Sequence, residues 1–272
     1  MWNTCEPDYA QASDSRHSTH RQQRAETSVY ALRLGDDALL AAQRMGEWIA
    51  AAPQLEEDVA LGNIALDLLG QARGLLTYAG QLENAGRDED ALVYFRDERD
   101  FLNAQLFELP NGDFGFTMAR LLVASTYQYA LYDRLQQSAD ETLAAIAAKA
   151  VKEVDYHRDH ATQWTLRLGD GTESSHRRMQ QAFEDLWPYV AELFESDELV
   201  TGLASRGVAV DPSSLEHPVL TYVDEVLARA TLTRPNTALR LGGGRRGVHT
   251  EQFGYLLAEM QHLARCHPGA QW

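Results

Sequence analysis

One stretch of the chain, residues 140–168, groups side chains that could bind a metal ion or stand in for one. Glu153 and His157 are four residues apart, about one helical turn, and Lys149 lies one turn before Glu153. Apolar residues around them recur every three or four positions, which predicts a helix with His157 on the centre of its buried face. Glu153 and His160 then lie on the edge of that face. Polar groups placed there are costly to bury unless they pair with each other or with a ligand.

A second half of such a metal site is missing from the sequence. A di-iron centre in a four-helix bundle needs one Glu from each of two helices and a Glu-x-x-His pair from each of the other two. A second predicted helix offers Asp67, but Gly70 stands where the imidazole is needed. In the helix of residues 140–168, Tyr156 stands three positions after Glu153, where the imidazole is needed. His157 is one position too far along. The six ligands are not present, so the sequence predicts a degenerate site that holds no functional metal ion.

We interpret this degenerate site as a polar remnant formed by Asp67, Lys149, Glu153, Tyr156 and His157. Lys149 is expected to neutralise Glu153, and Asp67 to accept hydrogen bonds from its neighbours. A paired buried charge of this kind is weak evidence of stability. One alternative stays open, namely a di-iron oxygenase in its own right that uses Asp67, Glu153 and His157 with unusual spacing.

Two literal Glu-x-x-His matches occur elsewhere, and neither is predicted to bind metal. Glu173 and His176 fall in a first helical turn, where acidic residues are ordinary. Glu259 and His262 lie away from the apolar stripe of the last predicted helix. Glu259 and His262 are therefore expected at the surface.

A glycine-rich loop at residues 242–247 carries Arg245 and Arg246. It lacks the Gly-Lys-Ser/Thr ending of a phosphate-binding P-loop and has no preceding strand. The two arginines could contact an anionic ligand or an acidic partner, or be solvated. A helical protein that binds an acyl-CoA through these arginines is a further alternative.

The elements that must position these groups are all predicted to be helices. Helices are expected from Asp36 to the break at Pro53, and over residues 55–79, 88–107, 116–135, 140–168, 172–195 (bent near Pro188), 218–230 and from Thr250 onward. The helix of residues 55–79 is apolar around most of its circumference, which indicates a central, enclosed helix. Residues 197–215 are expected to be irregular.

This pattern predicts an all-α fold, a ferritin-like bundle of long helices with additional C-terminal helices. Residues 1–28 are expected to be a disordered tail. Residues 29–272 are expected to form a single domain.

Composition narrows the function further. The chain has 272 residues with 24 Lys and Arg against 40 Asp and Glu, a formal net charge of -16, which disfavours a nucleic-acid surface. Its two cysteines fit a reducing compartment. No apolar run is long enough to cross a membrane, and the N-terminus lacks the apolar core of a signal peptide. We therefore expect a cytoplasmic protein.

Several short stretches, taken together, resemble a known family. They are residues 61–73 (LGNIALDLLGQAR), 95–101 (FRDERDF), 110–114 (PNGDF), 152–153 (KE) with 156–157 (YH), 247–251 (GVHTE) and 257–261 (LAEMQ). Their order and number are similar to those of the PaaC subunits of bacterial ring-1,2-phenylacetyl-CoA epoxidase. The resemblance extends from about residue 30 to the C-terminus.

This resemblance implies a ferritin-like, non-catalytic structural subunit of a multicomponent monooxygenase that acts in aerobic phenylacetate catabolism. In that family the sister subunit PaaA carries the di-iron centre and binds phenylacetyl-CoA, while a reductase component delivers electrons from NADPH. The expected partners are PaaA and the other epoxidase components, with self-association left open. No cofactor is expected on this chain. The charged segment from Arg96 to Asp100 and the last helix are expected to contact the partner.

Overall fold

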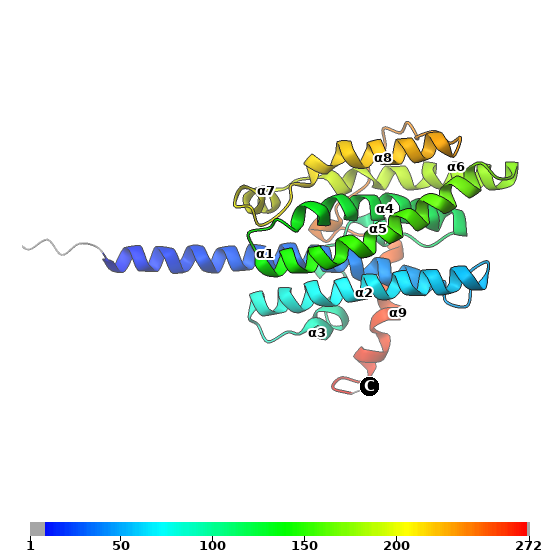
Figure 1. Cartoon of the computed structure of the whole chain (residues 1–272). Coiled ribbons are helices and arrows are strands. Elements are labelled where there is room, and N and C mark those ends of the chain that lie inside the picture. Colours follow the sequence, from blue (N-terminus) through cyan, green and yellow to red (C-terminus); the bar gives the residue numbers. More distant parts are fainter. Residues whose placement is uncertain (1–8, 271–272) are drawn as a thin grey trace, which may run out of the picture.

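Helices form the regular structure of residues 9–270, the part of the chain that the computed structural model describes, with side chains described from residue 21 onward (Figure 1). The α-helices are α1 (Tyr9–Gly46), α2 (Leu55–Glu83), α3 (Glu89–Tyr94), α4 (Phe114–Leu135), α5 (Glu141–Gly169), α6 (Glu173–Leu186), α7 (Glu198–Ser205), α8 (Glu216–Arg229) and α9 (Glu251–Cys266). Over this range no strand is present, so the all-α prediction is confirmed. Among the described helices, none combines the length and apolar character needed to cross a lipid bilayer.

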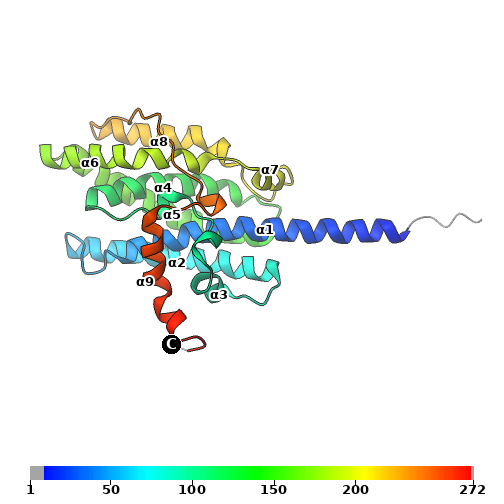
Figure 2. The same cartoon turned by 180° about the vertical axis from the view of Figure 1, so that it is seen from behind.

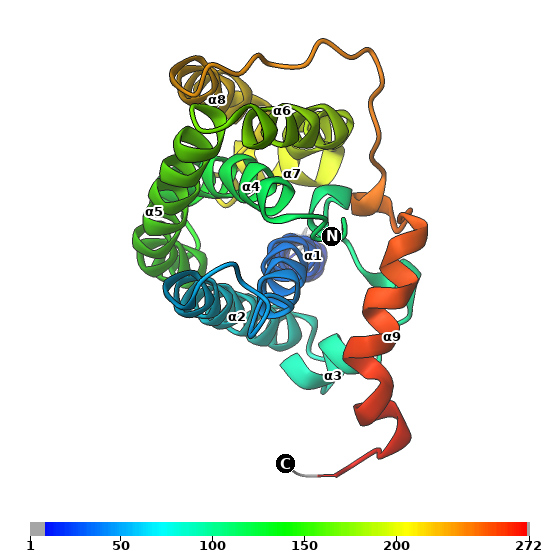
Figure 3. The same cartoon turned by 90° about the vertical axis from the view of Figure 1, so that its right-hand side faces the viewer.

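Two long helix pairs make the most extensive contacts, α1 with α2 and α4 with α5, and α2 also packs on α5. Viewed end-on, these four helices surround a common centre (Figure 3). Helices α6 and α8 cover the side of the bundle formed by α4 and α5. Helix α9 lies crosswise on another side and packs on α3 (Figures 2 and 3). The result is the four-helix frame of a ferritin-like bundle with additional C-terminal helices.

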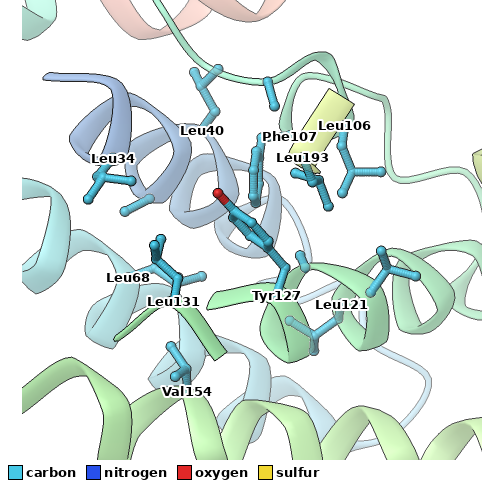
Figure 4. Packing of buried hydrophobic residues seen from close by; sticks show 14 of the residues in the cluster. Leu34, Leu40, Leu68, Leu106, Phe107, Leu121, Tyr127, Leu131, Val154 and Leu193 are labelled. Carbon is cyan, nitrogen blue, oxygen red and sulfur yellow. The ribbon is translucent and has the colours of Figure 1, made fainter. Parts of the chain in front are cut away.

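The bundle interior is filled by apolar side chains from all four long helices. Leu34 of α1, Leu68 of α2, Leu131 of α4 and Val154 of α5 are buried in one hydrophobic cluster (Figure 4). Tyr127 of α4 lies among them and is 3% exposed. Burying such side chains supplies most of the favourable free energy of folding.

Helix starts are defined by acidic or hydroxyl side chains that cap free backbone N–H groups. Asp113 accepts from the N–H of Phe116, and Asp140 accepts from Leu143 N–H at 3.0 Å. Thr172 forms a capping box at the start of α6. The predicted helices at residues 116–135 and 140–168 therefore match α4 and α5 closely.

The start of the first helix differs from the prediction. Helix α1 begins at Tyr9 rather than at Asp36, so residues 9–28 are helical in the structure, where the sequence suggested a disordered tail. Residues 1–8 of that tail lie outside the described range. Thr27 and Ser28 are buried because their hydroxyls donate to backbone carbonyls, Ser28 to Ala79 of α2 at 2.8 Å. A polar composition was consistent with disorder, but hydroxyls satisfied in this way can pack inside a helix pair.

The helix expected over residues 88–107 ends at Tyr94. Beyond that point Arg96 turns inward to Asp36, and the backbone N–H groups of Leu102 and Ala104 donate to Asp36 and Asp37, both at 2.9 Å. These carboxylates on α1 hold the segment extended except for two short 3-10 turns, η1 (Glu98–Asp100) and η2 (Gln105–Phe107). The prediction of one long charged helix was therefore wrong, because Arg96 pairs with a buried carboxylate of α1 instead of lying on an outer helix face.

Two further differences lie in the second half of the chain. Helix α6 ends at Leu186 and is followed by the 3-10 turns η3 (Trp187–Tyr189) and η4 (Ala191–Phe194), in place of one helix bent at Pro188. The region expected to be irregular contains α7, which Asp197 caps by accepting from Val200 N–H.

Candidate functional site

The predicted polar site lies along the contact between α2 and α5. His157 of α5 is fully buried, and its Nε2 is 3.1 Å from a carboxylate oxygen of Asp67 on α2. Burial lowers the pKa of His157, with Asp67 acting in the opposite direction, so the imidazole is neutral at pH 7. A neutral ring that donates from Nε2 leaves Nδ1 as an acceptor, and this atom is buried without a partner.

Glu153 has nitrogen donors at both carboxylate oxygens. Lys149 Nζ lies 3.2 Å from one oxygen, and Gln71 Nε2 donates to the other at 3.0 Å. The predicted pairing of Lys149 with Glu153 is present in the structure. Gln71 was missed, although it follows Asp67 by four positions and therefore lies on the same face of α2.

A second polar pair, which sequence reasoning also missed, continues the same contact. His160 Nε2 is 3.1 Å from Glu57 on α2, and Trp164 Nε1 donates to the same carboxylate at 2.8 Å. Tyr156 is half exposed, and its ring lies beside that of His160 with centroids 6.1 Å apart. The tyrosine therefore points out of the bundle. Its place in the remnant rests on spacing alone.

These residues do not fit a di-iron centre. Within the described part of the chain, no three side chains of His, Cys, Asp or Glu are grouped so that they could hold a metal ion. Each carboxylate is instead matched by an imidazole, an amide or an ammonium, and an ammonium has no lone pair to offer a metal. The hydroxyl of Ser125, on the neighbouring helix α4, donates to the backbone oxygen of Leu121, one turn earlier in the same helix.

Lowering the pH from about 7 to about 5 is expected to weaken the fold through His157 and His160. Burial lowers the pKa of both rings, so the unfolded chain takes up protons that the native chain excludes. The stability they contribute is present above the unfolded value of about 6.5 and is lost as the pH falls below it. Urea denaturation across this range measures the loss.

The variant His157→Gln provides the comparison, because its amide can still donate to Asp67 but does not titrate. It should show a shallower fall in stability on the acid side than the unaltered chain. Burial raises the pKa of Asp37 to about 6, so its protonation stabilises the fold as the pH falls, opposite to the effect of the histidines. This contribution is the same in the variant and in the unaltered chain. Identical pH profiles would contradict the role given to His157.

The glycine-rich loop does not present Arg245 to a ligand. Arg245 forms a two-point ion pair with Asp37 of α1, at 2.6 and 3.0 Å, and donates to the backbone oxygens of Arg33 and Leu102. Its donors are directed inward, so a contact of Arg245 with an external anion or an acidic partner, which the sequence left open, would have to displace these bonds. Arg246 is exposed and lies 3.8 Å from Glu195.

Arg96 is likewise part of the interior. Its side chain is 2% exposed and pairs with the fully buried Asp36 through two N–H groups. The guanidinium also stacks over the ring of Phe101 at 4.0 Å. Arg96 therefore cannot be a direct contact for a partner, contrary to the expectation for the charged segment.

Comparison with known proteins identifies the family of this chain. The chain belongs to the family of phenylacetic acid catabolic proteins that includes PaaA and PaaC, whose family model matches residues 10–272. It is 49% identical over 245 residues to the C subunit of the 1,2-phenylacetyl-CoA epoxidase of Escherichia coli (strain K12). This match covers 90% of the chain and 98% of the relative. The family resemblance inferred from short motifs is confirmed.

Proposed function

We propose that this chain is a non-catalytic structural subunit of a phenylacetyl-CoA epoxidase that acts in aerobic phenylacetate catabolism. It supports a di-iron catalytic subunit of the PaaA type through a helix–helix interface. The di-iron centre then belongs to that partner, and a reductase component supplies electrons from NADPH. The relative that covers nearly the whole chain is a subunit of such an epoxidase, which supports the assignment.

The arrangement of side chains around Glu153 is the observation that supports a non-catalytic role. Lys149 and Gln71 place an ammonium and an amide on its two oxygens. A bridging or terminal iron ligand needs those oxygens free, and the ammonium would also repel the cation. The role that remains for this cluster is to pair α2 with α5 and keep the bundle in shape.

Metal analysis of the isolated chain tests this role. The purified chain is expected to bind less than about a tenth of an equivalent of iron, because a di-iron site needs six ligands that the bundle lacks. It should show no oxygenase activity alone. Co-expression with the catalytic subunit should give a stable complex that carries iron in that subunit.

The variant Glu153→Ala separates the two open functions. In a structural subunit it leaves the iron content of the complex unchanged. Stoichiometric iron in the isolated chain that is lost in this variant would instead establish a di-iron oxygenase with atypical ligands.

A further inference from the structure

Helix α2 carries two apolar stripes, and only one of them packs inside the bundle. The inner stripe is buried and includes Leu61, Ile64, Leu68 and Leu75. The outer stripe consists of Leu55, Val59, Gly62, Leu66 and Leu69, at successive spacings of 4, 3, 4 and 3 residues. This is the spacing with which one helix packs along another in a coiled coil.

The side chains of the outer stripe are exposed to solvent. The exposed fractions of Leu55, Val59, Leu66 and Leu69 are 75%, 57%, 66% and 48%. Ile49, just beyond the end of α1, is 60% exposed. Among the described residues, eleven large hydrophobic side chains are exposed, and these five fall within one stretch of 21 positions. Such a concentration of exposed apolar side chains marks an interaction site. The prediction that α2 is enclosed on nearly all sides is therefore corrected.

A groove of about 330 Å³ runs beside the stripe and can admit side chains from a partner. It is lined by residues of α1, α2, α3 and α9, including Gly46, Gly62 and Ala65. A Cβ atom placed on Gly46 or Gly62 meets nothing within 4 Å. The glycines thus leave free space at the surface, which favours close approach of another helix.

Charge indicates what kind of partner fits. Between Arg44 and Arg73 the chain has no Lys or Arg but has five carboxylates. Asp67 and the buried Glu57 are paired with His157 and His160 of α5, which leaves Glu47, Glu56 and Asp58 as the acidic side chains available at the surface. A second copy would place this acidic surface against itself, with a net charge of -16 on each chain. A helix with basic residues beside its apolar stripe would be complementary.

We propose that the outer stripe of α2, with Ile49 and the adjoining groove, is the docking surface for a helix of the catalytic partner subunit. That helix carries its own apolar residues at alternating spacings of three and four, with Lys or Arg beside them. This inference rests on the proposed function, because it assigns the surface through which the structural subunit holds its partner.

Two variants of the stripe test the proposal in the complex with the catalytic subunit. Leu66→Lys combined with Leu69→Lys replaces exposed apolar groups by cations. Gly62→Gln fills the open space beside them and improves helix propensity, so it should fold at least as well as the unaltered chain. Each variant is expected to raise the dissociation constant of the complex by about 30-fold, which is the effect typical of changing a residue central to binding. The matched control is Leu239→Lys, at an exposed leucine outside the groove.

Sedimentation of each purified chain with the catalytic subunit gives the readout, together with the thermal midpoint of each chain alone. Failure of the unaltered chain to bind would contradict the proposed function. Binding that is retained by both stripe variants would overturn the docking surface and leave the function standing. If the variants abolished self-association of this chain and left binding of the catalytic subunit unchanged, the docking proposal would also be overturned. The stripe would then be the contact between two copies of this chain.

Discussion

Replacing Arg96 by leucine is expected to lower the free energy of unfolding by about 3–5 kcal/mol, the usual cost of removing one partner of a buried ion pair. Asp36 is fully buried and would keep a charge with no cation beside it. The segment after α3 would also lose the guanidinium that stacks on Phe101 and donates to the oxygens of Leu92 and Asp100. Urea or thermal denaturation measures the effect.

Two comparisons show whether the loss comes from the uncompensated charge. Adding Asp36→Asn to Arg96→Leu removes the charge and keeps an oxygen for Leu102 N–H, so it should recover part of the stability. Arg73→Leu removes an arginine whose side chain is 76% exposed beside Glu89, and should cost less than about 1 kcal/mol. If Arg96→Leu and Arg73→Leu lowered the free energy of unfolding equally, burial of the Arg96–Asp36 pair would not be the cause of the loss.

Arg96 is therefore unsuitable as a probe of the partner interface. A charge reversal at this position would separate α3 from α1 inside the subunit, and weaker co-purification would then report misfolding. Exposed residues of α2, such as Leu66, provide that test without disturbing the core.

Local periodicity was sufficient to predict the long helices and the contacts within one helix. The pairing of Lys149 with Glu153 follows from a spacing of four on α5, which one sequence displays directly. Gln71 and Glu57 complete the polar contact from another helix. They were missed because the register between α2 and α5 depends on packing that a single sequence does not display.

The charges after α3 and the apolar circumference of α2 were both misjudged for a related reason. Arg96 turns inward only because Asp36, 60 positions earlier, lies opposite it. Leu66 and Leu69 have the spacing of core residues, yet they are exposed in the single chain. Periodicity indicates that an apolar stripe requires a partner surface. It does not indicate whether that surface belongs to the same chain or to another one.

Replacing Glu192 by alanine is expected to cost on the order of 4 kcal/mol, because three buried N–H groups would lose their acceptor. The side chain, 2% exposed, accepts from the backbone N–H groups of Gln105, Gly243 and Gly244, each at 2.7 Å. It thereby joins the glycine-rich loop to the segment before α4 and aligns Arg245 with its carboxylate partner on α1. Denaturation gives the global loss, and faster hydrogen exchange at the two glycines gives the local one.

The stability of Glu192→Gln should lie between those of the unaltered chain and Glu192→Ala. One oxygen remains to accept from the two glycines, while the amide NH₂ group faces the N–H of Gln105 and cannot accept from it. The matched control is Glu195→Ala, three positions further along, where the side chain is 52% exposed and 3.8 Å from Arg246. That change should cost less than about 0.5 kcal/mol, as is usual for surface positions. Comparable losses at positions 192 and 195 would contradict the anchoring role. A larger loss at 192 with exchange confined to the loop would show that this carboxylate fixes the C-terminal part of the chain to the bundle.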